Sequence, residues 1–416
     1  MNWLLLRIGI RNVLRQRRRS LFNVLTLGVN TSMLILLMGI LRGFYGLTLD
    51  KTIDLRTGHL QIHHQNYEEE KRRLPLDITI KHSAQLTAAV DSLEDVIAAS
   101  PRVAASAAIS NGRERTGVLL YGVEPAAENK VGVILKSVVK GKTLTDSTWG
   151  ILIGDKLAEL LDADVGTSLV LYARTQQNAN NLLDAEVVGI FDSGFALADR
   201  TMVFAPIAYT NELLDMHDEV TEIVIRAKNY RVVRPLVEEV ANVGKELHID
   251  SLVVEPWYDI ARDIVAGVKA DMVSYAVIGV ILVILAVFGI TNTMTVSVYE
   301  RTAEIGALRA LGMEKKQVHR MFLWEGIALG IGGSIIGVLL GSVLVWYMSK
   351  YGIAFPKEAA DSVTYPLGDH FYARTGLIDW FIGMGLAILC ALAGAVFPAR
   401  RASKVPVTSA LARGVR

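Results

Sequence analysis

The sequence predicts a membrane α-helical bundle of four transmembrane helices, with a large α+β extracytoplasmic domain inserted between helices 1 and 2. Two observations predict this fold class. Hydrophobic residues make up 51% of the 416 residues, which is high for a purely soluble protein. Four apolar stretches each reach the roughly 20 residues that a helix needs to cross a bilayer, and Lys and Arg cluster beside them on one predicted side.

The parts of the chain follow from the positions of these four stretches. In chain order, we predict a cytoplasmic amphipathic helix (1–20), the first transmembrane helix (21–47), a periplasmic α+β domain (48–271), the second transmembrane helix (272–298), a cytoplasmic loop with a short helix (299–321), the third transmembrane helix (322–349), a short periplasmic loop (350–377), the fourth transmembrane helix (378–397) and a cytoplasmic tail (398–416). The first stretch is longer than the roughly 7–15 apolar residues of a signal peptide and lacks a small-x-small cleavage site, so we expect it to be retained.

The distribution of basic residues sets the predicted orientation. They gather before the first stretch, between the second and third, and after the fourth, at Arg11, Arg15, Arg17, Arg18, Arg19, Arg301, Arg309, Lys315, Lys316, Arg320, Arg400, Arg401, Lys404, Arg413 and Arg416. Short cytoplasmic loops carry an excess of Lys and Arg, so both termini and the loop 299–321 are expected in the cytoplasm. Arg42, at the outer end of the first helix, is expected to reach the lipid headgroups.

The outer domain is predicted from two strand–helix–strand patterns. One comprises a strand at 56–64, a helix at 83–100 and a strand at 117–123, and the other a strand at 221–227, a helix at 231–247 and a strand at 250–256. They indicate an α+β domain built from a split pair of βαβ-type units. A helix starting at Trp257 is expected to continue without a break into the second transmembrane helix.

Glycines recur at intervals of four in two sets in the third transmembrane helix: Gly326 and Gly330, then Gly333, Gly337 and Gly341. This spacing places each set on one face of the helix and favours close packing within the bundle. His59 and His63 share one side of a predicted strand, but two histidines without a third ligand do not make a metal site. We expect them on a solvated strand face.

No motif for catalysis is found in the sequence. The segment Gly141–Thr143 reads GKT, but a phosphate-binding loop also requires a glycine where Lys136 stands. Nucleophile-elbow, zinc-protease and metal-ligand spacings do not occur. We therefore predict no catalytic residues, no metal, no cofactor bound by this chain and no enzymatic activity. The net charge of +1 gives no indication of nucleic-acid binding, and the single cysteine, Cys390, excludes a disulfide within the chain.

The loop between the second and third stretches is the most informative segment. It reads as a short helix with a break at Gly312. One apolar side is expected from Ile305, Leu308 and Leu311, edged by Glu304, Arg309 and Arg301. Such a helix can rest in the lipid headgroups or fill a groove on a partner protein, and composition alone does not choose between them.

The sequence ERTAEIGALRALGM in this loop resembles the signature of ABC-transporter permeases of the macrolide-exporter and lipoprotein-releasing superfamily (FtsX-like permeases). The resemblance implies that this segment is the coupling helix, which docks on a separate ATPase subunit. The matching residues are Glu300, Arg301, Glu304, Ile305, Gly306, Leu308, Arg309, Ala310, Leu311 and Gly312. The tail FPARRASKVPVTSAL is similar to the family ending, through Pro398, Ala399, Arg400, Ala402, Pro406 and Leu411.

Within the superfamily, GHLQIHHQNY (58–67) and GVLLYGVEPAAENKV (117–131) most resemble the lipoprotein-releasing branch. This resemblance implies an exporter permease of the bacterial inner (cytoplasmic) membrane, multi-pass and non-catalytic, with ATP-Mg bound on the partner ATPase. It also implies a second permease chain, identical or paralogous, and contact with membrane lipids. A periplasmic carrier is a further candidate partner, although the loop expected to bind such a carrier is not recognisable in YARTQQNANNLLDAEV (172–187).

The mechanism implied is mechanical coupling that extracts or exports an amphiphilic cargo, with lipoproteins from the outer leaflet as the leading candidate. The possible substrate-lining residues lie on the first and second transmembrane helices, at Leu34, Leu37, Ile40, Val277, Ile281 and Ile284. Packing or lipid contact explains these residues equally well. Two alternative functions stay open: a permease that exports an antibiotic or peptide, and a signalling scaffold that activates a cell-wall hydrolase.

Overall fold

The computed structural model describes residues 11, 17–217, 219–249, 251–354 and 370–406. The chain forms two compact units. One unit comprises Met1–Tyr45, Val268–Ile353 and Phe371–Arg416, and the other comprises Gly46–Gly267 and Ala354–His370. Most of the predicted N-terminal amphipathic helix, most of the loop 350–377 and the last part of the tail, with Leu411, lie outside the described residues.

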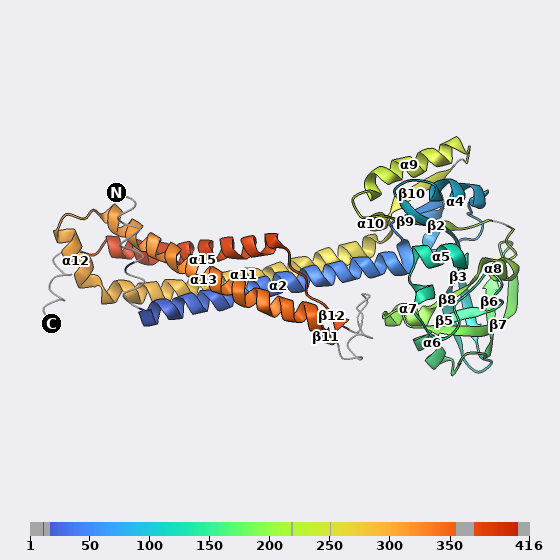
Figure 1. The fold of residues 1–416 in the computed structure, drawn as a ribbon, viewed down its shortest axis with the longest axis horizontal. Helices are drawn as coiled ribbons and strands as arrows, with labels where there is room; N and C mark the ends of the chain where they lie inside the picture. Colours follow the sequence, from blue (N-terminus) through green and yellow to red (C-terminus); the bar gives the residue numbers. More distant parts are fainter. Residues whose placement is uncertain (1–10, 12–16, 218, 250, 355–369, 407–416) are drawn as a thin grey trace. The chain divides into compact units, whose positions relative to one another are not determined.

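The first unit is a bundle of four long helices that lie side by side (Figure 1). They are α2 (Arg17–Thr52), α11 (Arg262–Glu300), α13 (Lys315–Tyr351) and α15 (Leu377–Ser403). Among the described residues, these four are long and apolar enough to cross a membrane, which confirms the predicted number of such helices. At about 1.5 Å per residue, the 39 residues of α11 span about 58 Å, which exceeds the roughly 30 Å of a hydrocarbon core.

Glycines bring the helices of the bundle into close contact. Two glycines of α13 face α15 and three face α2, in the order Gly326, Gly330, Gly333, Gly337 and Gly341. A Cβ at Gly330 would lie 2.9 Å from the Cβ of Ala391, and one at Gly337 would lie 2.4 Å from the Cβ of Thr31. Neither distance is compatible with a real side chain. The glycine pattern therefore packs helices, as predicted: the first set packs against α15 and the second against α2.

Arg42 of α2 has a protein partner within the bundle, contrary to the expectation that it only reaches the headgroups. Its guanidinium lies 2.7 Å from the carboxylate of Asp379, which is buried in the first turn of α15. The Asp379 carboxylate also accepts a hydrogen bond from the backbone N–H of Gly376. The sequence did not indicate this pair because its members are more than 300 positions apart.

The second unit is an α+β domain around one mixed sheet. Its strands are β1 (Leu60–His64), β2 (Val96–Ser110), β3 (Arg115–Val123), β4 (Val138–Gly141), β5 (Ile151–Gly154), β6 (Ser168–Arg174), β7 (Asn180–Phe191), β8 (Met202–Pro206), β9 (Glu222–Ala227) and β10 (Leu252–Pro256). Their order is β10-β1-β9-β2-β3-β8-β5-β7-β4, and β6 pairs with both β2 and β7. Strands β11 (Ile353–Ala354) and β12 (His370–Phe371) form a separate ladder.

Short helices connect these strands. They are α3 (Tyr67–Glu70), α4 (Ser83–Asp91), α5 (Pro125–Val131), α6 (Asp155–Leu160), α7 (Ala196–Thr201), α8 (Ile207–Leu214), α9 (Val233–Glu246) and α10 (Trp257–Ile260), with a π-helical turn η1 (Ile53–Thr57) after α2 and 3-10 turns η2 (Lys71–Arg73) and η3 (Ile134–Lys136). The predicted uninterrupted helix from Trp257 is wrong, because α10 ends at Ile260 and α11 begins at Arg262. The N–H of Trp257 donates to the carbonyl of His59, which ties α10 to the domain rather than to α11.

The sheet contains a split pair of βαβ-type units, as predicted, but the first unit ends on β2 and not on the predicted strand 117–123, which lies within β3. Strand β1 lies between β9 and β10 and is antiparallel to both, so the unit β9-α9-β10 is split by β1. In turn, β9 lies between β1 and β2 and is antiparallel to both, so the unit containing β1, α4 and β2 is split by β9. The two units therefore interleave in one sheet.

One boundary within these units differs from the prediction. The helix expected at 83–100 ends at Asp91, and Val96 begins β2, a strand of 15 residues. Alanine favours helices, and the alanines of this segment suggested a helical continuation. In the structure, β2 pairs with β9 along its first half and with β3 along its second half. Pairing on both edges outweighs the local helix propensity.

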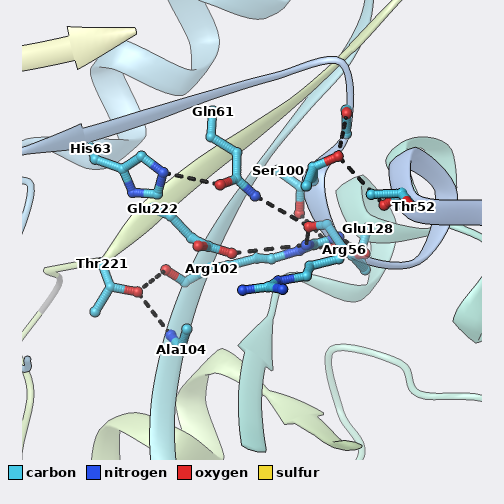
Figure 2. Close-up of polar contacts among 12 residues, drawn as sticks. Thr52, Arg56, Gln61, His63, Ser100, Arg102, Ala104, Glu128, Thr221 and Glu222 are labelled. Carbon is cyan, nitrogen blue, oxygen red and sulfur yellow. Dashed lines mark hydrogen bonds and ion pairs between the residues drawn. The ribbon is translucent and has the colours of Figure 1, made fainter. Parts of the chain in front are cut away.

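A buried network of polar groups joins η1, β2, β9 and α5 (Figure 2). The guanidinium of Arg102 donates to the Glu128 carboxylate through Nε and Nη2, at 2.8 and 2.5 Å, and through Nη1 to the backbone carbonyl of Arg56 at 2.9 Å. A Glu222 oxygen lies 3.8 Å away, and burial raises the pKa of that carboxyl. Ser100 also donates to Glu128. This network fixes η1 to the sheet within the α+β domain.

His59 and His63 are buried, so the expectation that they lie on a solvated strand face is wrong. His63 is 1% exposed, stacks on Tyr67 with ring centroids 4.8 Å apart, and lies 3.0 Å from the Gln61 amide oxygen. Burial lowers the pKa of His63 to about 3 and that of His59 to about 4. Both imidazoles are therefore neutral core groups.

Candidate functional site

The predicted coupling segment forms a short helix, α12 (Thr302–Ala310), between α11 and α13. Arg301 leaves the helical conformation and separates α12 from α11. At the other end, Gly312 adopts a left-handed conformation with φ +100°. Its N–H donates to the carbonyl of Arg309 and the Met313 N–H to that of Leu308, which is the Schellman arrangement that ends a helix. The chain therefore turns sharply on both sides of α12.

A buried ion pair holds α12 against α13. The guanidinium of Arg301 lies 3.1 Å from the Glu325 carboxylate, and these two residues are 7% and 6% exposed. The Arg301 Nε donates to Glu304 at 3.2 Å, and the guanidinium lies over the ring of Phe322. Because the cation and one carboxylate are enclosed, removing either one would leave the other as an uncompensated buried charge.

Apolar contacts and a tail contact complete the attachment of α12. Ile305 is buried in a core cluster with Met321 and Phe322 of α13 and Ala399 of α15. Near the end of α12, Arg309 donates a hydrogen bond to the carbonyl of Val405, just beyond α15. The helix is therefore held at its start, middle and end.

The predicted apolar side of α12 is divided between the core and the surface. Ile305 is 1% exposed, Leu308 is half-buried and Leu311 is 86% exposed. Three residues along a helix turn by about 300°, so positions i and i+6 point about 120° apart. The expectation of a single apolar face was therefore wrong. Ile305 anchors α12 to its own bundle, and Leu311 is the apolar group it presents outward.

The ten residues of the predicted coupling site fall into three groups. Buried are Arg301, Ile305 and Gly306; half-buried are Leu308 and Arg309; exposed are Glu300, Glu304, Ala310, Leu311 and Gly312. The sequence reasoning did not assign Glu325 to this site. The signal was available, because Glu325 is the acidic residue nearest the centre of an apolar stretch and such a residue requires a cation.

The residues predicted to line a substrate path differ in exposure between α2 and α11. Leu34 is buried, and Leu37 and Ile40 are half-buried, by their own chain. Val277, Ile281 and Ile284 of α11 are each about half exposed, at 56%, 50% and 48%. The two helices touch in this unit, because the Asn30 side chain donates to the carbonyl of Leu282 at 3.1 Å. The α11 residues are thus the ones accessible to a lipid, cargo or second chain.

Among the described residues, one group of side chains could converge on a metal ion: Asp155, Asp192 and Asp199. Burial raises the pKa of Asp199 to about 6. One Asp199 oxygen already accepts a hydrogen bond from the Ser193 N–H, within the same loop. These contacts explain the loop structure without an ion, and the predicted absence of a metal stays a prediction.

The described fold and site define a class: a multi-pass membrane protein with an α+β domain between its first two helices and a short anchored helix between its second and third. Comparison with known families agrees. Residues 20–243 match the family described as MacB-like periplasmic core domain, and residues 276–407 match that described as FtsX-like permease C-terminal. The chain therefore belongs to the MacB-like, FtsX-like family of ABC transporter permeases.

Two lipoprotein-releasing transmembrane proteins are similar to this chain over most of its length. It is 23% identical over 426 residues to the lipoprotein-releasing system transmembrane protein LolC of Xylella fastidiosa, covering 97% of each chain. It is 24% identical over 339 residues to the lipoprotein-releasing system transmembrane protein LolE of Haemophilus influenzae, covering 79% of this chain and 80% of that one. Its similarity to the crystal structure of the periplasmic region of MacB from Actinobacillus actinomycetemcomitans has a TM-score of 0.36 at 12% identity, over 51% of this chain and 95% of that one.

As a member of this family, the chain is a permease subunit and not itself an enzyme, as predicted.

Proposed function

We propose that the chain is the permease subunit of an ATP-driven exporter that extracts lipoproteins, or a closely similar acylated cargo, from the outer leaflet of the bacterial inner membrane. The observation that supports this cargo most directly is the similarity to two lipoprotein-releasing transmembrane proteins, one of them over 97% of both chains. Partial matches to a permease of unspecified cargo, such as YtrF of Bacillus subtilis over 33% of this chain, support the class but not a different cargo.

The α+β domain is placed outside the cytoplasm in this proposal, and α12 inside it. Support comes from the Lys and Arg residues at the end of the bundle that holds α12, since such residues favour the cytoplasmic side. Described members of this group include Lys315, Lys316, Arg320, Arg400 and Arg401.

The ATPase is a separate protein that docks on α12. Leu311 supplies an exposed apolar anchor, and half-buried Leu308 extends it toward the bundle. Because Arg301, Ile305 and Arg309 fix α12 to α13 and to the segment after α15, a displacement of α12 would reach the membrane helices directly. ATP-Mg binds on that partner and not on this chain.

A second permease chain completes the transporter. Its contact is assigned to α11, because only 11% of the apolar window of this helix is covered by its own chain, against 33–39% for the other three helices. The half-exposed residues Val277, Ile281 and Ile284 then face the partner chain, the cargo or lipid.

The proposal is tested by mutation of the exposed anchor in the full chain. Truncating an apolar anchor in a groove typically costs about 2 kcal/mol or more, which weakens binding roughly 30-fold. Leu311→Asp is therefore expected to abolish co-purification of the ATPase, and Leu308→Asp to weaken it strongly. Glu304→Ala, at the rim, should have a milder effect. Acylated proteins that co-purify with the wild-type complex in mild detergent, identified by mass spectrometry, test the cargo.

Leu182→Asp is the matched control, because it makes the same change at an exposed leucine of the α+β domain. It should leave ATPase binding unchanged. If Leu311→Asp and Leu308→Asp both retain the ATPase at wild-type affinity, the docking role of α12 is wrong and the helix rests in the headgroups. If the complex carries peptides or antibiotics and no acylated protein, the cargo assignment is wrong.

A further inference from the structure

A basic cavity lies at the end of the helix bundle that holds α12. It has a volume of about 350 Å³ and is formed by the first two turns of α13 and the last turn of α15. Its lining residues are Lys315, Lys316, His319, Arg320, Arg400 and Ser403. Neither the docking of α12 nor the packing of the bundle uses these side chains.

The cavity concentrates positive charge without a visible counter-charge. Its lining contains four cationic side chains and, among the described residues, no carboxylate. Like charges held together by two helices repel one another, so the arrangement is stabilised when an anion binds. The neighbouring Arg401 is different, because its guanidinium lies over the ring of Tyr299, 5.1 Å from the centroid.

One residue of the lining, His319, also has an unsatisfied polar atom. The Nδ1 atom of His319 is enclosed, and the described residues provide no hydrogen-bond partner for it. Buried polar atoms in proteins nearly always have a partner, so an isolated one calls for an explanation such as a bound group. Ser403 adds a hydroxyl to the lining, and this hydroxyl donates to the Arg400 carbonyl at 2.8 Å.

The position of the cavity along the helices matches the headgroup layer of a membrane. Arg320 precedes the first large buried apolar residues of α13, Met321 and Phe322. On α15, Arg400 follows Phe397, which is 59% exposed, by three residues, or roughly 4.5 Å along the axis. Cations and an exposed aromatic ring therefore lie next to each other, as phosphate and acyl chain do in a phospholipid.

We propose that this cavity binds the phosphate-bearing headgroup of an anionic phospholipid. Lys and Arg bind phosphate oxygens through charge-assisted hydrogen bonds, and basic pockets between membrane helices recognise anionic headgroups. The adjacent Phe397 favours a lipid over free phosphate, because it supplies apolar contact for an acyl chain. The proposed orientation of the chain places this lipid in the cytoplasmic leaflet, but the binding itself does not depend on the ATPase or the cargo.

The experiment measures lipid binding to the purified full chain without ATPase. Phosphatidylglycerol is titrated against phosphatidylcholine and inorganic phosphate, with native mass spectrometry as the readout. Each basic residue near an anionic surface contributes about 1 kcal/mol, or about fivefold in affinity, so Arg320→Gln/Arg400→Gln should weaken phosphatidylglycerol binding roughly 30-fold. Arg320→Lys/Arg400→Lys keeps the charge and should retain most of the binding. Higher salt should weaken wild-type binding.

Arg401→Gln/Lys404→Gln is the matched control, because it removes the same charge at the same end of the bundle outside the cavity. It should bind phosphatidylglycerol within about twofold of wild type. Equal losses in both double variants would overturn the proposal, as would binding of inorganic phosphate at the concentrations that bind phosphatidylglycerol. Unchanged lipid binding in Arg320→Gln/Arg400→Gln, with loss of ATPase co-purification, would instead make the cavity a protein-docking surface and also overturn it.

Discussion

The α+β domain and the helix bundle each bury an arginine, and the two arginines differ in how completely they are satisfied. Arg102 of the domain donates from Nε and Nη2 to the buried Glu128 carboxylate and from Nη1 to the carbonyl of Arg56. Arg301 of the bundle has one enclosed partner, Glu325, and one partner, Glu304, whose side chain is 48% exposed. The Arg102–Glu128 pair is enclosed, whereas the ion pairs of Arg301 are open to water on the side of Glu304.

The ion pair of Arg102 is therefore fixed, whereas Arg301 can exchange one of its partners. A fully desolvated charge pair is costly to break, because either partner alone becomes an uncompensated buried charge. An arginine with one solvent-facing partner can replace that partner with water or with a group on another protein at lower cost. The sealed pair lies where η1 joins the sheet, and the open pair lies at the start of the helix to which we assign the docking of a partner.

The largest effect is expected from removing the sealed cation. Arg102→Met leaves Glu128 and Glu222 buried without their arginine, and breaking such a pair typically costs about 3–5 kcal/mol. Arg301→Met should cost less, because it leaves only one enclosed carboxylate, Glu325, without its arginine, while Glu304 reaches water. Thermal unfolding of the full-length variants in detergent, followed by a probe in each unit, measures both changes. The double variant Arg102→Met/Glu128→Gln should recover part of the loss, since it also removes the stranded carboxylate.

Equal destabilisation by Arg102→Met and Arg301→Met would break the comparison. It would mean that Glu304 is as fully enclosed in the working protein as Glu128 is. If Arg301→Met instead impairs only ATPase docking and leaves the unfolding temperature unchanged, the role of Arg301 lies in the partner contact.

Features set by local physical constraints were predictable from the sequence. The thickness of a bilayer fixes the length of an apolar stretch, so the four long helices were predicted in number. The split βαβ pair was predicted from two local patterns, and the packing role of Gly330 and Gly337 from their spacing. The apolar stretches and the glycine spacing each lie within about 30 consecutive residues.

Features set by distant partners were not predictable. The ion pairs of Arg42 with Asp379 and of Arg102 with Glu222 join segments more than 100 positions apart in the chain, and no local pattern indicates them. His63 looked like a residue of a solvated strand, and its burial follows from β1 lying between two other strands. The same limit applies to α12: the pattern predicted its existence, but its exposed side depended on which residue packed on α13.

A smaller effect is expected from the way the bundle packs. Small residues, rather than a sealed polar network, bring α13 and α2 together at Gly337. Gly337→Ala would place a methyl group 2.4 Å from the Cβ of Thr31 and 2.8 Å from the carbonyl oxygen of Gly28, and overpacking of this kind typically costs about 1–3 kcal/mol. Detergent-solubilised protein should show a lower unfolding temperature for the bundle.

Gly385→Ala on α15 is the matched control, since nothing lies within 4 Å of its added methyl group. It should leave the unfolding temperature unchanged or raise it slightly, because alanine favours the helix. If Gly337→Ala is as stable as Gly385→Ala, the close contact between α2 and α13 is not maintained in the protein. Small residues then contribute little to the packing of the bundle.

The smallest expected effect is on the pH dependence of stability. It tests whether water is excluded from the core of the α+β domain beside Arg102. His63 lies in that core, and burial lowers its pKa to about 3, while an unfolded histidine has a pKa of about 6.5. Between these values the unfolded chain binds a proton that the folded chain does not, so stability falls as the pH is lowered. From pH 7 to pH 6 the loss of folding stability due to this one group is about 0.7 kcal/mol.

Asp199, whose pKa is raised to about 6 by burial, acts in the opposite direction and is common to every variant compared. His63→Gln should therefore lose about 0.7 kcal/mol less than wild type over this step, whatever its stability at pH 7, and above pH 7.5 the two stability curves should run parallel. Identical pH dependence in denaturant unfolding of the two full chains would mean that His63 gains a proton in the folded state, and hence that water reaches the core beside Arg102.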